Sequence, residues 1–305
     1  MLVSVCIPSI RPNTIGATLR SLSAQTRGEW EAIVVGQGDD LAVRTAVELE
    51  MERDPRIRFL HVPRRGVGRA RNAAIRIARG EVLALLDDDC EASPTWLEVI
   101  VSILRSEPRV GAVGGAVHAP AARRGWPRRC PSLMPAEAVY DPVATPGMPP
   151  DGWNWIGCNF AMRGSVAAYV GDFDEFLGAG AAFPSGDDTD YKLRLEALGV
   201  VVRSSPRVVV RHTSGWRYGW RAVLRHQRNY ARGNGGLAGK LSLLGDPRGE
   251  RWLEGMRGLY LREARRNPAR LLPALRGYRH YAEAYRECVA TYRVDARGLL
   301  IRAVG

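Results

Sequence analysis

Three consecutive carboxylates, Asp87, Asp88 and Asp89, follow the apolar segment Val82 to Leu86. A segment this apolar is typical of a strand inside a sheet covered on both faces, where ligands bind beyond the carboxyl ends of the strands. Like charges ~4 Å apart repel by about 4 kcal/mol at an effective dielectric near 20. A divalent cation such as Mg²⁺ or Mn²⁺ removes that repulsion. The alternative is that Asp88 or Asp89 caps a helix that begins near Pro94.

Short apolar segments alternate with amphipathic ones around these acids. Strands are expected at 2–7, 31–35, 57–62, 82–86 and 110–117, and helices at 13–25, 41–53, 70–77 and 94–104. This alternation is typical of an α/β fold built on a doubly wound sheet. Eight of the 19 prolines fall between Pro120 and Pro150, which predicts a long ordered loop or lid. Beyond it, strands are expected at 155–162, 200–202 and 207–212, a helix at 188–198, and further helices toward the C-terminus.

The cysteines and the apolar segments indicate a compartment. The chain has five scattered cysteines and no C-x-x-C pair: Cys6, Cys90, Cys130, Cys158 and Cys288. This pattern argues against a disulfide framework or a zinc site and fits a reducing cytoplasm. No basic region precedes the first apolar segment, so we expect no signal peptide. No apolar run approaches the roughly 18 residues of a membrane span.

The net charge of +12 is concentrated in the last third of the chain. From Arg211 onward the sequence has 20 basic and 7 acidic residues, a charge of +13, which leaves −1 for everything before it. Arginines at 217, 221, 225, 228 and 232 fall on one stripe of a helix, with Trp216 and Trp220 beside it. The segment suggests an anionic partner such as a membrane surface. A soluble arginine-rich surface, or a packing contact, is the alternative.

Several short motifs follow one another in a fixed order between residues 1 and 215. They are Val5-Cys-Ile-Pro8 with Arg11-Pro12, Ile33-Val-Val35, Gly66-x-x-x-Ala70-Arg71-Asn72-Ala73-Ala74, Gly80-Glu81 with Leu86-Asp87-Asp88-Asp89, Gly157-Cys-Asn159, Gly171-Asp-Phe173-Asp174-Glu175, Asp187-Asp188-Thr-Asp190 and His212. With this ordered set the chain resembles family 2 glycosyltransferases, inverting enzymes with the GT-A fold. The resemblance implies an α/β fold with a Rossmann-like mixed sheet flanked by helices, to which the basic segment adds a C-terminal helical extension.

The resemblance also implies a role for each matching position. Asp87-x-Asp89 looks like the family's D-x-D motif, with Asp89 on a Mn²⁺ or Mg²⁺ ion and Asp87 near the ribose or the metal. His212 stands where the family places a late histidine near the metal and the diphosphate, and Asp188 occupies the position of the catalytic base. The nucleotide-sugar donor is expected to contact Pro8, Ser9, Arg11, Gln37, Gly66, Arg71, Asp87, Asp88 and Arg217.

Departures from the family pattern refine the prediction. The family usually has an acid after the second strand that recognises the base, and this chain has Gln37 near that position. Gln37 can both donate and accept hydrogen bonds, so the sequence does not imply that the base of the nucleotide is uracil. The residues after Gln227 do not match the Gln-x-x-Arg-Trp motif of processive synthases, so we expect transfer of a single sugar. The expected regions are a nucleotide-sugar-binding half at 1–117, an acceptor-binding half with the Pro-rich loop at 118–211, and a basic helical region at 212–305.

The leading prediction is a metal-dependent inverting glycosyltransferase that acts on a hydroxyl acceptor in polysaccharide, glycolipid or secondary-metabolite glycosylation. It would be cytoplasmic, with peripheral contact at the inner face of the membrane or with a lipid-linked acceptor. A nucleotidyltransferase is the first alternative, but it normally carries a Gly-rich basic loop where this chain has Ile7 to Pro12. A basic nucleic-acid-binding module is the second, but the aromatic residues of the tail fall at packing intervals, and no nucleic acid is expected.

Several of these side chains also have purely structural interpretations. Acidic residues in the first turn of a helix compensate its dipole; we keep this interpretation for Asp190 and assign Asp188 to catalysis. His212 could be a satisfied buried histidine. Asn159 and Trp155 could contact the acceptor or belong to the core, and the sequence leaves both interpretations open.

Overall fold

The computed structural model describes residues 1–122, 128–266 and 271–303. The chain forms two compact units. The first unit contains 1–65, 69–172 and 191–217, and the second contains 66–68, 173–190 and 218–305. The three-region division expected from the sequence remains a prediction. Part of the Pro-rich loop, 123–127, lies outside the described residues.

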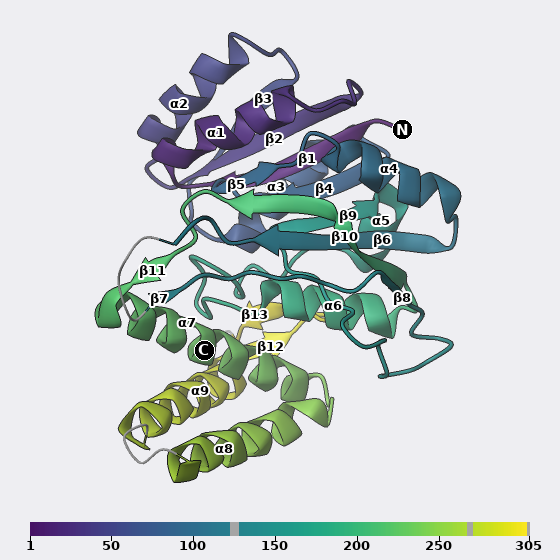
Figure 1. Ribbon diagram of the computed structural model, residues 1–305. Coiled ribbons are helices and arrows are strands. Elements are labelled where there is room, and N and C mark those ends of the chain that lie inside the picture. The colour runs from purple at the N-terminus through teal and green to yellow at the C-terminus, as the bar shows by residue number, and fades with distance from the viewer. Residues whose placement is uncertain (123–127, 267–270, 304–305) are drawn as a thin grey trace. The chain divides into compact units, whose positions relative to one another are not determined.

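A mixed sheet forms the centre of the first unit (Figure 1). Six strands run parallel: β1 (Val3–Ser9), β2 (Trp30–Gln37), β3 (Ile57–Val62), β4 (Val82–Leu86), β6 (Val110–His118) and β10 (Val201–His212). The antiparallel strand β9 (Asn159–Arg163) lies between β4 and β6. Short strands β5 (Cys90–Ala92) and β8 (Ala138–Tyr140) pair antiparallel with β10. The described strands follow the order β3-β2-β1-β4-β9-β6-β10-β5, and the carboxyl ends of β1, β2, β4 and β10 share one edge.

Helices with an apolar face cover this sheet. The helices are α1 (Pro12–Ser23), α2 (Leu41–Met51), α3 (Val67–Ile77), α4 (Trp96–Ser106), α5 (Gly164–Val170) and α6 (Asp187–Ala197). In α1, Ile15, Leu19 and Leu22 recur at helical spacing and are all buried in the main core. In α4, Trp96 and Ile100 enter the same core. The strands read as near-continuous apolar segments because both faces of the sheet are covered.

Two expectations about strands in the first unit were wrong, and the alternative role of Asp88 or Asp89 as a helix cap is excluded. α4 begins at Trp96 after the strand β5, so neither Asp88 nor Asp89 caps it. β9 begins at Asn159 instead of 155, because the preceding residues form a turn. The two strands expected at 200–202 and 207–212 are one strand, β10, whose register against β6 shifts between Ser205 and Val209. Pro206 lies in that irregularity, where its missing N–H breaks no ladder hydrogen bond.

The second unit contains three long helices and a hairpin. They are α7 (Gly219–Leu243), α8 (Arg248–Arg266), α9 (Leu271–Thr291), β12 (Tyr292–Val294) and β13 (Leu300–Arg302). α7 and α9 pack closely because α7 has glycines at the contact. A Cβ at Gly235 would lie 2.1 Å from the carbonyl oxygen of Tyr281, and one at Gly239 would lie 2.6 Å from Cβ of Cys288. Outside the second unit, the two-residue strand β7 (Arg128–Arg129) pairs with β11 (Arg217–Tyr218), which begins at the last residue of the first unit.

A buried lysine organises the second unit. Lys240 is fully buried, and its Nζ lies 2.8 Å from Asp174 Oδ2 and 2.5 Å from Asp190 Oδ1. Asp174 Oδ2 also accepts the N–H of Leu300 at 2.9 Å, which ties the C-terminal hairpin to this charge cluster. The structural role expected for Asp190 is therefore confirmed.

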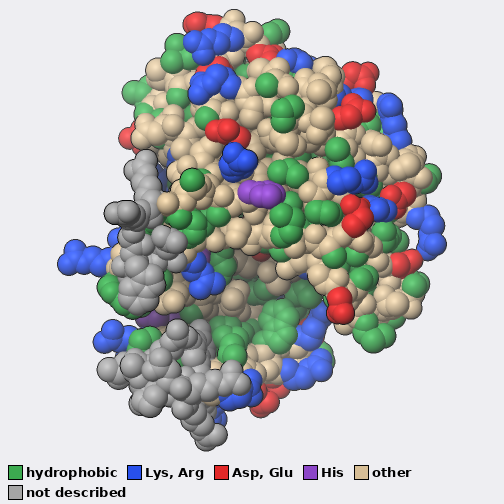
Figure 2. Space-filling view, viewed as in Figure 1, with side chains coloured by type: hydrophobic (Ala, Val, Ile, Leu, Met, Phe, Trp, Pro, Cys, Tyr) green, Lys and Arg blue, Asp and Glu red, His purple; other side chains and the backbone are tan. Residues whose placement is uncertain are grey.

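Basic and acidic side chains intermingle on the visible surface of the first unit (Figure 2). This mixture agrees with the near-zero charge of the residues before Arg211. Among the helices that the structure describes, none combines the length and the apolar character needed to cross a bilayer.

Candidate functional site

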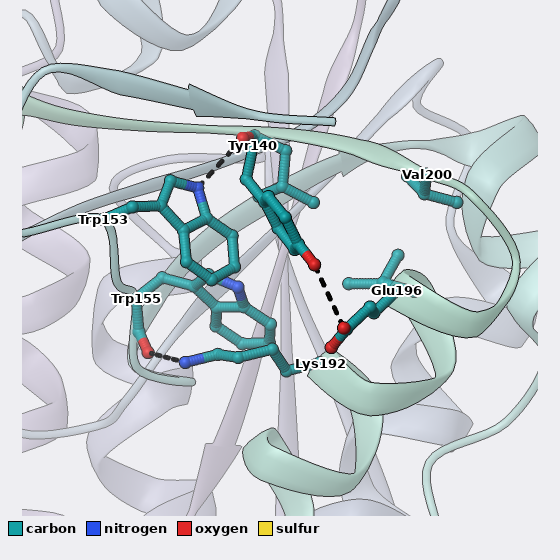
Figure 3. Close-up of a pocket in the computed structure, with 8 residues that line it drawn as sticks. Tyr140, Trp153, Trp155, Lys192, Glu196 and Val200 are labelled. Atoms are coloured by element: carbon teal, nitrogen blue, oxygen red, sulfur yellow. Dashed lines mark hydrogen bonds between the residues drawn. The ribbon is translucent and has the colours of Figure 1, made fainter. Parts of the chain in front are cut away.

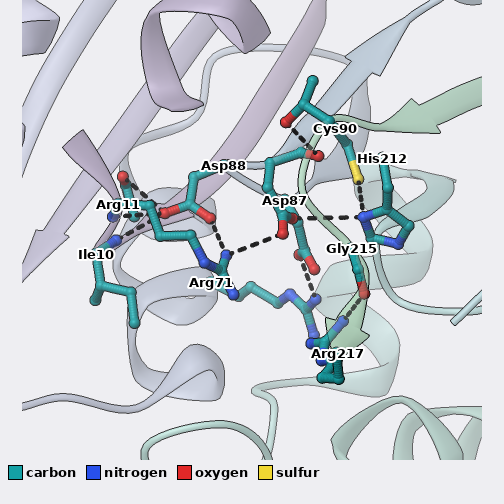
Figure 4. Close-up of polar contacts among 12 residues, drawn as sticks. Ile10, Arg11, Arg71, Asp87, Asp88, Cys90, His212, Gly215 and Arg217 are labelled. Carbon is teal, nitrogen blue, oxygen red and sulfur yellow. Dashed lines mark hydrogen bonds and ion pairs between the residues drawn. The ribbon is translucent and has the colours of Figure 1, made fainter. Parts of the chain in front are cut away.

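The three aspartates after β4 have different surroundings (Figure 4). β4 is buried along its whole length and ends at Leu86, so Asp87, Asp88 and Asp89 emerge at the carboxyl edge of the sheet. The side chain of Asp87 is 33% exposed, whereas Asp88 and Asp89 are buried. Only Asp87 therefore presents a substantial carboxylate surface to solvent among these three.

Asp88 holds the turn that follows β1. Its Oδ2 accepts the N–H groups of Ile10 and Arg11 at 2.8 and 2.9 Å and the hydroxyl of Ser9 at 3.1 Å. The guanidinium of Arg11 donates to the other oxygen. Backbone and side-chain hydrogen-bond donors thus surround this carboxylate. Its role in binding the nucleotide sugar remains a prediction, and Asp88 would exert it by holding the Ser9 to Arg11 turn.

Asp87 faces Arg71. Arg71 Nη2 lies 3.4 Å from Asp87 Oδ1 and donates to the carbonyl oxygen of Gly157 at 3.0 Å, so a buried guanidinium is held in place next to the carboxylate. Burial raises the pKa of Asp87; the charge of Arg71 lowers this pKa, and repulsion from Asp89 and Asp88 raises it. A cation near Asp87 would relieve this repulsion.

Asp89 pairs with His212, the last residue of β10. Asp89 Oδ1 lies 3.6 Å from His212 Nδ1, and Asp89 Oδ2 lies 3.5 Å from Arg11 Nη1. Burial opposes ionisation of Asp89, but His212, Arg11 and the charge of Arg217 hold its pKa below the usual range. Burial also disfavours the charged form of His212, yet Asp89 and Cys158 raise the pKa of His212 to about 10. The pair therefore strongly favours a charged imidazole and a charged carboxylate when no metal is bound.

The donor set fits a hard divalent cation. Asp87 and Asp89 supply carboxylate oxygens, which Mg²⁺ and Mn²⁺ prefer. The Nε2 atom of His212 is buried without a hydrogen-bond partner within the described part of the chain, so it can coordinate a cation once its proton has left. Burial contributes most to the raised pKa of Asp87, and a bound cation would offset both this burial and the repulsion from Asp89 and Asp88. Asp87, Asp89 and His212 would hold the ion.

Two cysteines that the sequence analysis set aside lie beside His212. Cys90 Sγ is 3.4 Å from His212 Nδ1, and Cys158 belongs to the same buried group. Burial and the neighbouring thiol raise the pKa of Cys90, whereas the hydrogen bonds from Cys90 and His212 lower the pKa of Cys158. Nothing in the spacing of these cysteines predicted this cluster, because β5, the segment before β9 and the end of β10 are remote in sequence.

The other residues expected to contact the nucleotide sugar are spread over the two units. Pro8, Ser9 and Gln37 end β1 and β2 at the same edge as Asp87. Arg217 donates a hydrogen bond to the carbonyl oxygen of Gly215, and its charge lowers the pKa of Asp89.

Gly66 and Asp188 belong to the second unit. Gly66 has φ of 151°, a conformation that favours glycine. Asp188 lies in the first turn of α6, is half-buried, and accepts the N–H of Thr189 at 2.8 Å. Their assignments as donor contact and base remain predictions.

An aromatic cluster lies on the first unit (Figure 3). Lys192 Nζ lies 5.0 Å from the ring centre of Trp155 and 5.5 Å from that of Trp153, and it also bonds the carbonyl oxygen of Trp155 at 3.3 Å. Glu196 accepts the hydroxyl of Tyr140 at 3.0 Å. Apart from Trp155, whose buried ring stacks on a neighbouring phenylalanine, the members of this cluster had no recognisable signal in the sequence.

Asn159 is a core residue. It is fully buried, accepts the indole N–H of Trp96 at 2.9 Å, and donates to the carbonyl oxygens of Ala116 and Val208 at 2.8 and 2.9 Å. These bonds join β9 to its neighbours and leave the side chain no surface for an acceptor.

The fold and the acidic edge can now be compared with known proteins. A family model described as Glycosyl transferase family 2 matches residues 4–167, more than half of the chain. The chain belongs to glycosyl transferase family 2. The matched segment includes the whole Asp87–Asp89 edge and Arg71, but it ends before Asp188 and His212.

Curated relatives match between about a third and two thirds of the chain. The glucosyl-dolichyl phosphate glucuronosyltransferase of Haloferax volcanii is 26% identical over 181 residues, which cover 58% of this chain and 56% of that protein. The succinoglycan biosynthesis protein ExoM of Rhizobium meliloti is 28% identical over 215 residues, 68% of this chain and 65% of that protein. The match thus spans less than two thirds of the length of each relative. An Escherichia coli protein named UDP-Glc:alpha-D-GlcNAc-diphosphoundecaprenol beta-1,3-glucosyltransferase WfgD is 33% identical over 105 residues, 34% of this chain and 41% of that protein.

Solved structures confirm the GT-A fold expected from the sequence. The mannosyltransferase PcManGT of Pyrobaculum calidifontis, in complex with GDP-Man and Mn²⁺, superposes with a TM-score of 0.58 at 17% identity, covering 94% of this chain and 86% of that one. Residues 1–349 of S. aureus TarS superpose with a TM-score of 0.53 at 17% identity, covering 76% and 64%.

Proposed function

We propose that this chain is a metal-dependent inverting glycosyltransferase that moves one sugar from a nucleotide-diphosphate sugar to a hydroxyl acceptor. The observation that carries the proposal is the gathering of Asp87, Asp89 and His212 with the guanidinium groups of Arg11 and Arg71 at one edge of the sheet. Acids that bind a cation and cations that bind a diphosphate lie within the same few ångströms. The family membership and the fold support this assignment.

Each group has a separate task in the proposed reaction. The metal ion would act as a Lewis acid on the diphosphate leaving group. Arg71 supplies a cationic donor that its bond to Gly157 has already oriented, so little reorganisation is needed when charge develops. Arg11 and Arg217 add positive charge at the same edge, since both lower the pKa of Asp89.

Asp188 is the proposed base. A sugar hydroxyl is a poor nucleophile and needs a positioned group that takes its proton. Asp188 lies at the start of α6 and is only half-buried. If Asp188 takes only the proton and forms no bond to the sugar, a single displacement occurs and the anomeric centre inverts.

The proposed acceptor is lipid-linked, and the protein would work at the cytoplasmic face of a membrane. Two relatives carry names that specify a dolichyl phosphate or a diphosphoundecaprenol substrate. In α7 of this chain, Trp220, Arg221, Arg225 and Arg228 are exposed. An exposed tryptophan beside three cationic side chains suits contact with an anionic lipid surface. The stripe ends at Arg232, which pairs with Glu287 of α9 at 2.7 Å.

A thermal-shift screen tests the donor site. The full chain is heated with each nucleoside diphosphate, with and without Mn²⁺, and at least one diphosphate should stabilise the protein only with the metal. Asp89→Ala should abolish this metal-dependent shift and sugar transfer, while Glu91→Ala, two positions on and exposed, should retain both. Full activity of Asp89→Ala, or of wild type in excess chelator, would contradict the metal assignment. Formation of a nucleotide sugar from a nucleoside triphosphate and a sugar phosphate, without transfer, would favour a nucleotidyltransferase.

A further inference from the structure

Two thiols and an imidazole meet in the interior of the first unit, and Figure 4 shows two of the three residues, Cys90 and His212. Cys90 opens β5, Cys158 immediately precedes β9, and His212 ends β10. Cys90 Sγ lies 3.4 Å from His212 Nδ1, and the ligand atoms of all three residues lie within 4.8 Å of one another. All three residues are buried, so competing water has little access.

The spacing of these atoms fits one tetrahedral ion. Zinc binds thiolate sulfur at about 2.3 Å and imidazole nitrogen at about 2.0–2.1 Å. At a tetrahedral angle, such a sulfur and nitrogen lie roughly 3.5 Å apart, and two such sulfurs lie roughly 3.8 Å apart. The observed sulfur–nitrogen distance of 3.4 Å agrees with the first value, and the 4.8 Å limit accommodates the second. The side chains need only small adjustments to enclose an ion.

Asp89 would have to move toward the two thiols to complete the coordination, because it is not in the group whose ligand atoms all lie within 4.8 Å of one another. Its Oδ1 lies 3.6 Å from His212 Nδ1, close to the roughly 3.4 Å expected between oxygen and nitrogen ligands of one tetrahedral zinc ion. The set would then contain two sulfurs, one nitrogen and one oxygen, all from buried residues.

We propose that Cys90 Sγ, Cys158 Sγ and His212 Nδ1, with Asp89 in the fourth position, form a binding site for a soft divalent cation of the zinc class. Thiolate and imidazole ligands select zinc, whereas Mg²⁺ and Mn²⁺ prefer oxygen ligands. Binding releases three protons to solvent, one from each thiol and the one on Nδ1 of His212. The site shares Asp89 and His212 with the proposed catalytic metal, so zinc and the catalytic ion should exclude each other.

Direct metal measurements test the site without relying on catalysis. The full chain is reduced, stripped with a chelator, and titrated with Zn²⁺ against a chromophoric competitor; Co²⁺ is added in a parallel titration. We expect one tight equivalent of zinc per chain. We also expect a thiolate-to-cobalt charge-transfer band and the intense visible bands of four-coordinate cobalt. X-ray absorption of the zinc form should show two sulfur neighbours at about 2.3 Å.

Cysteine variants locate the ion. Cys90→Ala and Cys158→Ala should each weaken zinc binding by at least ~10-fold. Loss of a group that only hydrogen-bonds to a metal ligand already costs about 10-fold in affinity, and loss of the ligand itself should cost at least as much. Cys6→Ala and Cys288→Ala remove equally buried thiols elsewhere and should bind zinc like wild type. Circular dichroism of each variant checks folding, and the absorption spectrum of wild type gives an answer even if a variant fails to fold.

Three results would overturn the proposal. The first is zinc binding that is equal in wild type and in both Cys90→Ala and Cys158→Ala. The second is a zinc spectrum without sulfur neighbours. The third is a Cys90–Cys158 disulfide that persists in the reducing buffer.

The competition between zinc and the catalytic ion is measured separately and rests on the proposed function. Zn²⁺ should abolish the Mn²⁺-dependent thermal shift with a nucleoside diphosphate in wild type, but not in Cys158→Ala. Failure of this arm alone would count against the shared ligands and leave the zinc site intact.

Discussion

Replacing neighbouring aspartates separates the residue that holds the turn after β1 from the residue that faces the ligand. Asp88→Ala leaves the N–H groups of Ile10 and Arg11 without their acceptor. A buried donor without a partner costs about 1–3 kcal/mol. The Arg11 side chain is 41% exposed, so water partly replaces the lost bonds. We therefore expect a loss of about 2–4 kcal/mol in the free energy of unfolding for the two amides together.

Asp87→Ala should behave in the opposite way. Burial and the neighbouring carboxylates raise the pKa of Asp87 in the folded state, so its ionised form disfavours folding at neutral pH. Removing it relieves repulsion and loses only the 3.4 Å contact with Arg71. The unfolding free energy should stay within about 1 kcal/mol of wild type, while the Mn²⁺-dependent response to a nucleoside diphosphate should disappear.

Thermal unfolding with and without Mn²⁺ and a nucleoside diphosphate measures both effects. For a chain of this size about 2 °C corresponds to 1 kcal/mol, so Asp88→Ala should unfold about 4–8 °C below wild type. Asp88→Asn keeps one oxygen acceptor, so its unfolding temperature should lie between those of wild type and Asp88→Ala. The reasoning is refuted if Asp88→Ala unfolds with wild type but loses the ligand response, because Asp88 would then contact the ligand. Loss of stability in Asp87→Ala instead would refute it equally.

Three other changes test the base, the lysine cluster and the basic stripe. Asp188→Asn keeps the shape but removes basicity, and should lower the transfer rate by ~10²-fold or more with donor binding unchanged. Lys240→Met leaves two buried carboxylates uncompensated and should cost about 3–5 kcal/mol in a denaturation series, whereas Arg232→Met breaks a partly exposed pair on the same helix and should cost about 1 kcal/mol or less. Arg221→Glu with Arg225→Glu should abolish salt-sensitive co-sedimentation with anionic vesicles, since each arginine near such a surface contributes about 1 kcal/mol.

Each of these three changes has a clear contrary outcome. Wild-type turnover in Asp188→Asn would make that residue structural. Equal stability of Lys240→Met and Arg232→Met would show that the buried charges are not essential to the second unit. Equal, negligible binding of wild type to neutral and anionic vesicles would make the basic stripe of α7 a packing surface and favour a soluble acceptor.

Local patterns were sufficient to predict much of the first unit. The limits of β3 and β4 were predicted to the residue, because polar or turn-forming residues flank each segment. Placing Asp87, Asp88 and Asp89 at a ligand-binding edge also needed no coordinates, because parallel strands share the edge at which they end. The continuity of β10 was missed because Ser204, Ser205 and Pro206 look like a strand break, and only pairing with β6 carries the strand across them.

The second unit depended more on long-range packing. The arginines of α7 were visible at helical spacing, but the glycines that bring α7 against α9 had no local signal of their partner. Lys240 likewise reads as an ordinary surface residue. Its burial depends on Asp174 and Asp190, which lie 50 or more residues earlier in the chain.

The sequence by itself determined the family, the type of fold and the acids that would carry the chemistry, because residue type and short spacing encode strands, turns and ligand preference. Only the tertiary structure decided that Asp88 holds the turn after β1 and that Asp87 faces solvent. It also decided that Cys90 and Cys158 meet at His212. Side-chain direction and contacts between distant segments depend on how strands pair and helices pack, and a one-dimensional pattern does not contain that information.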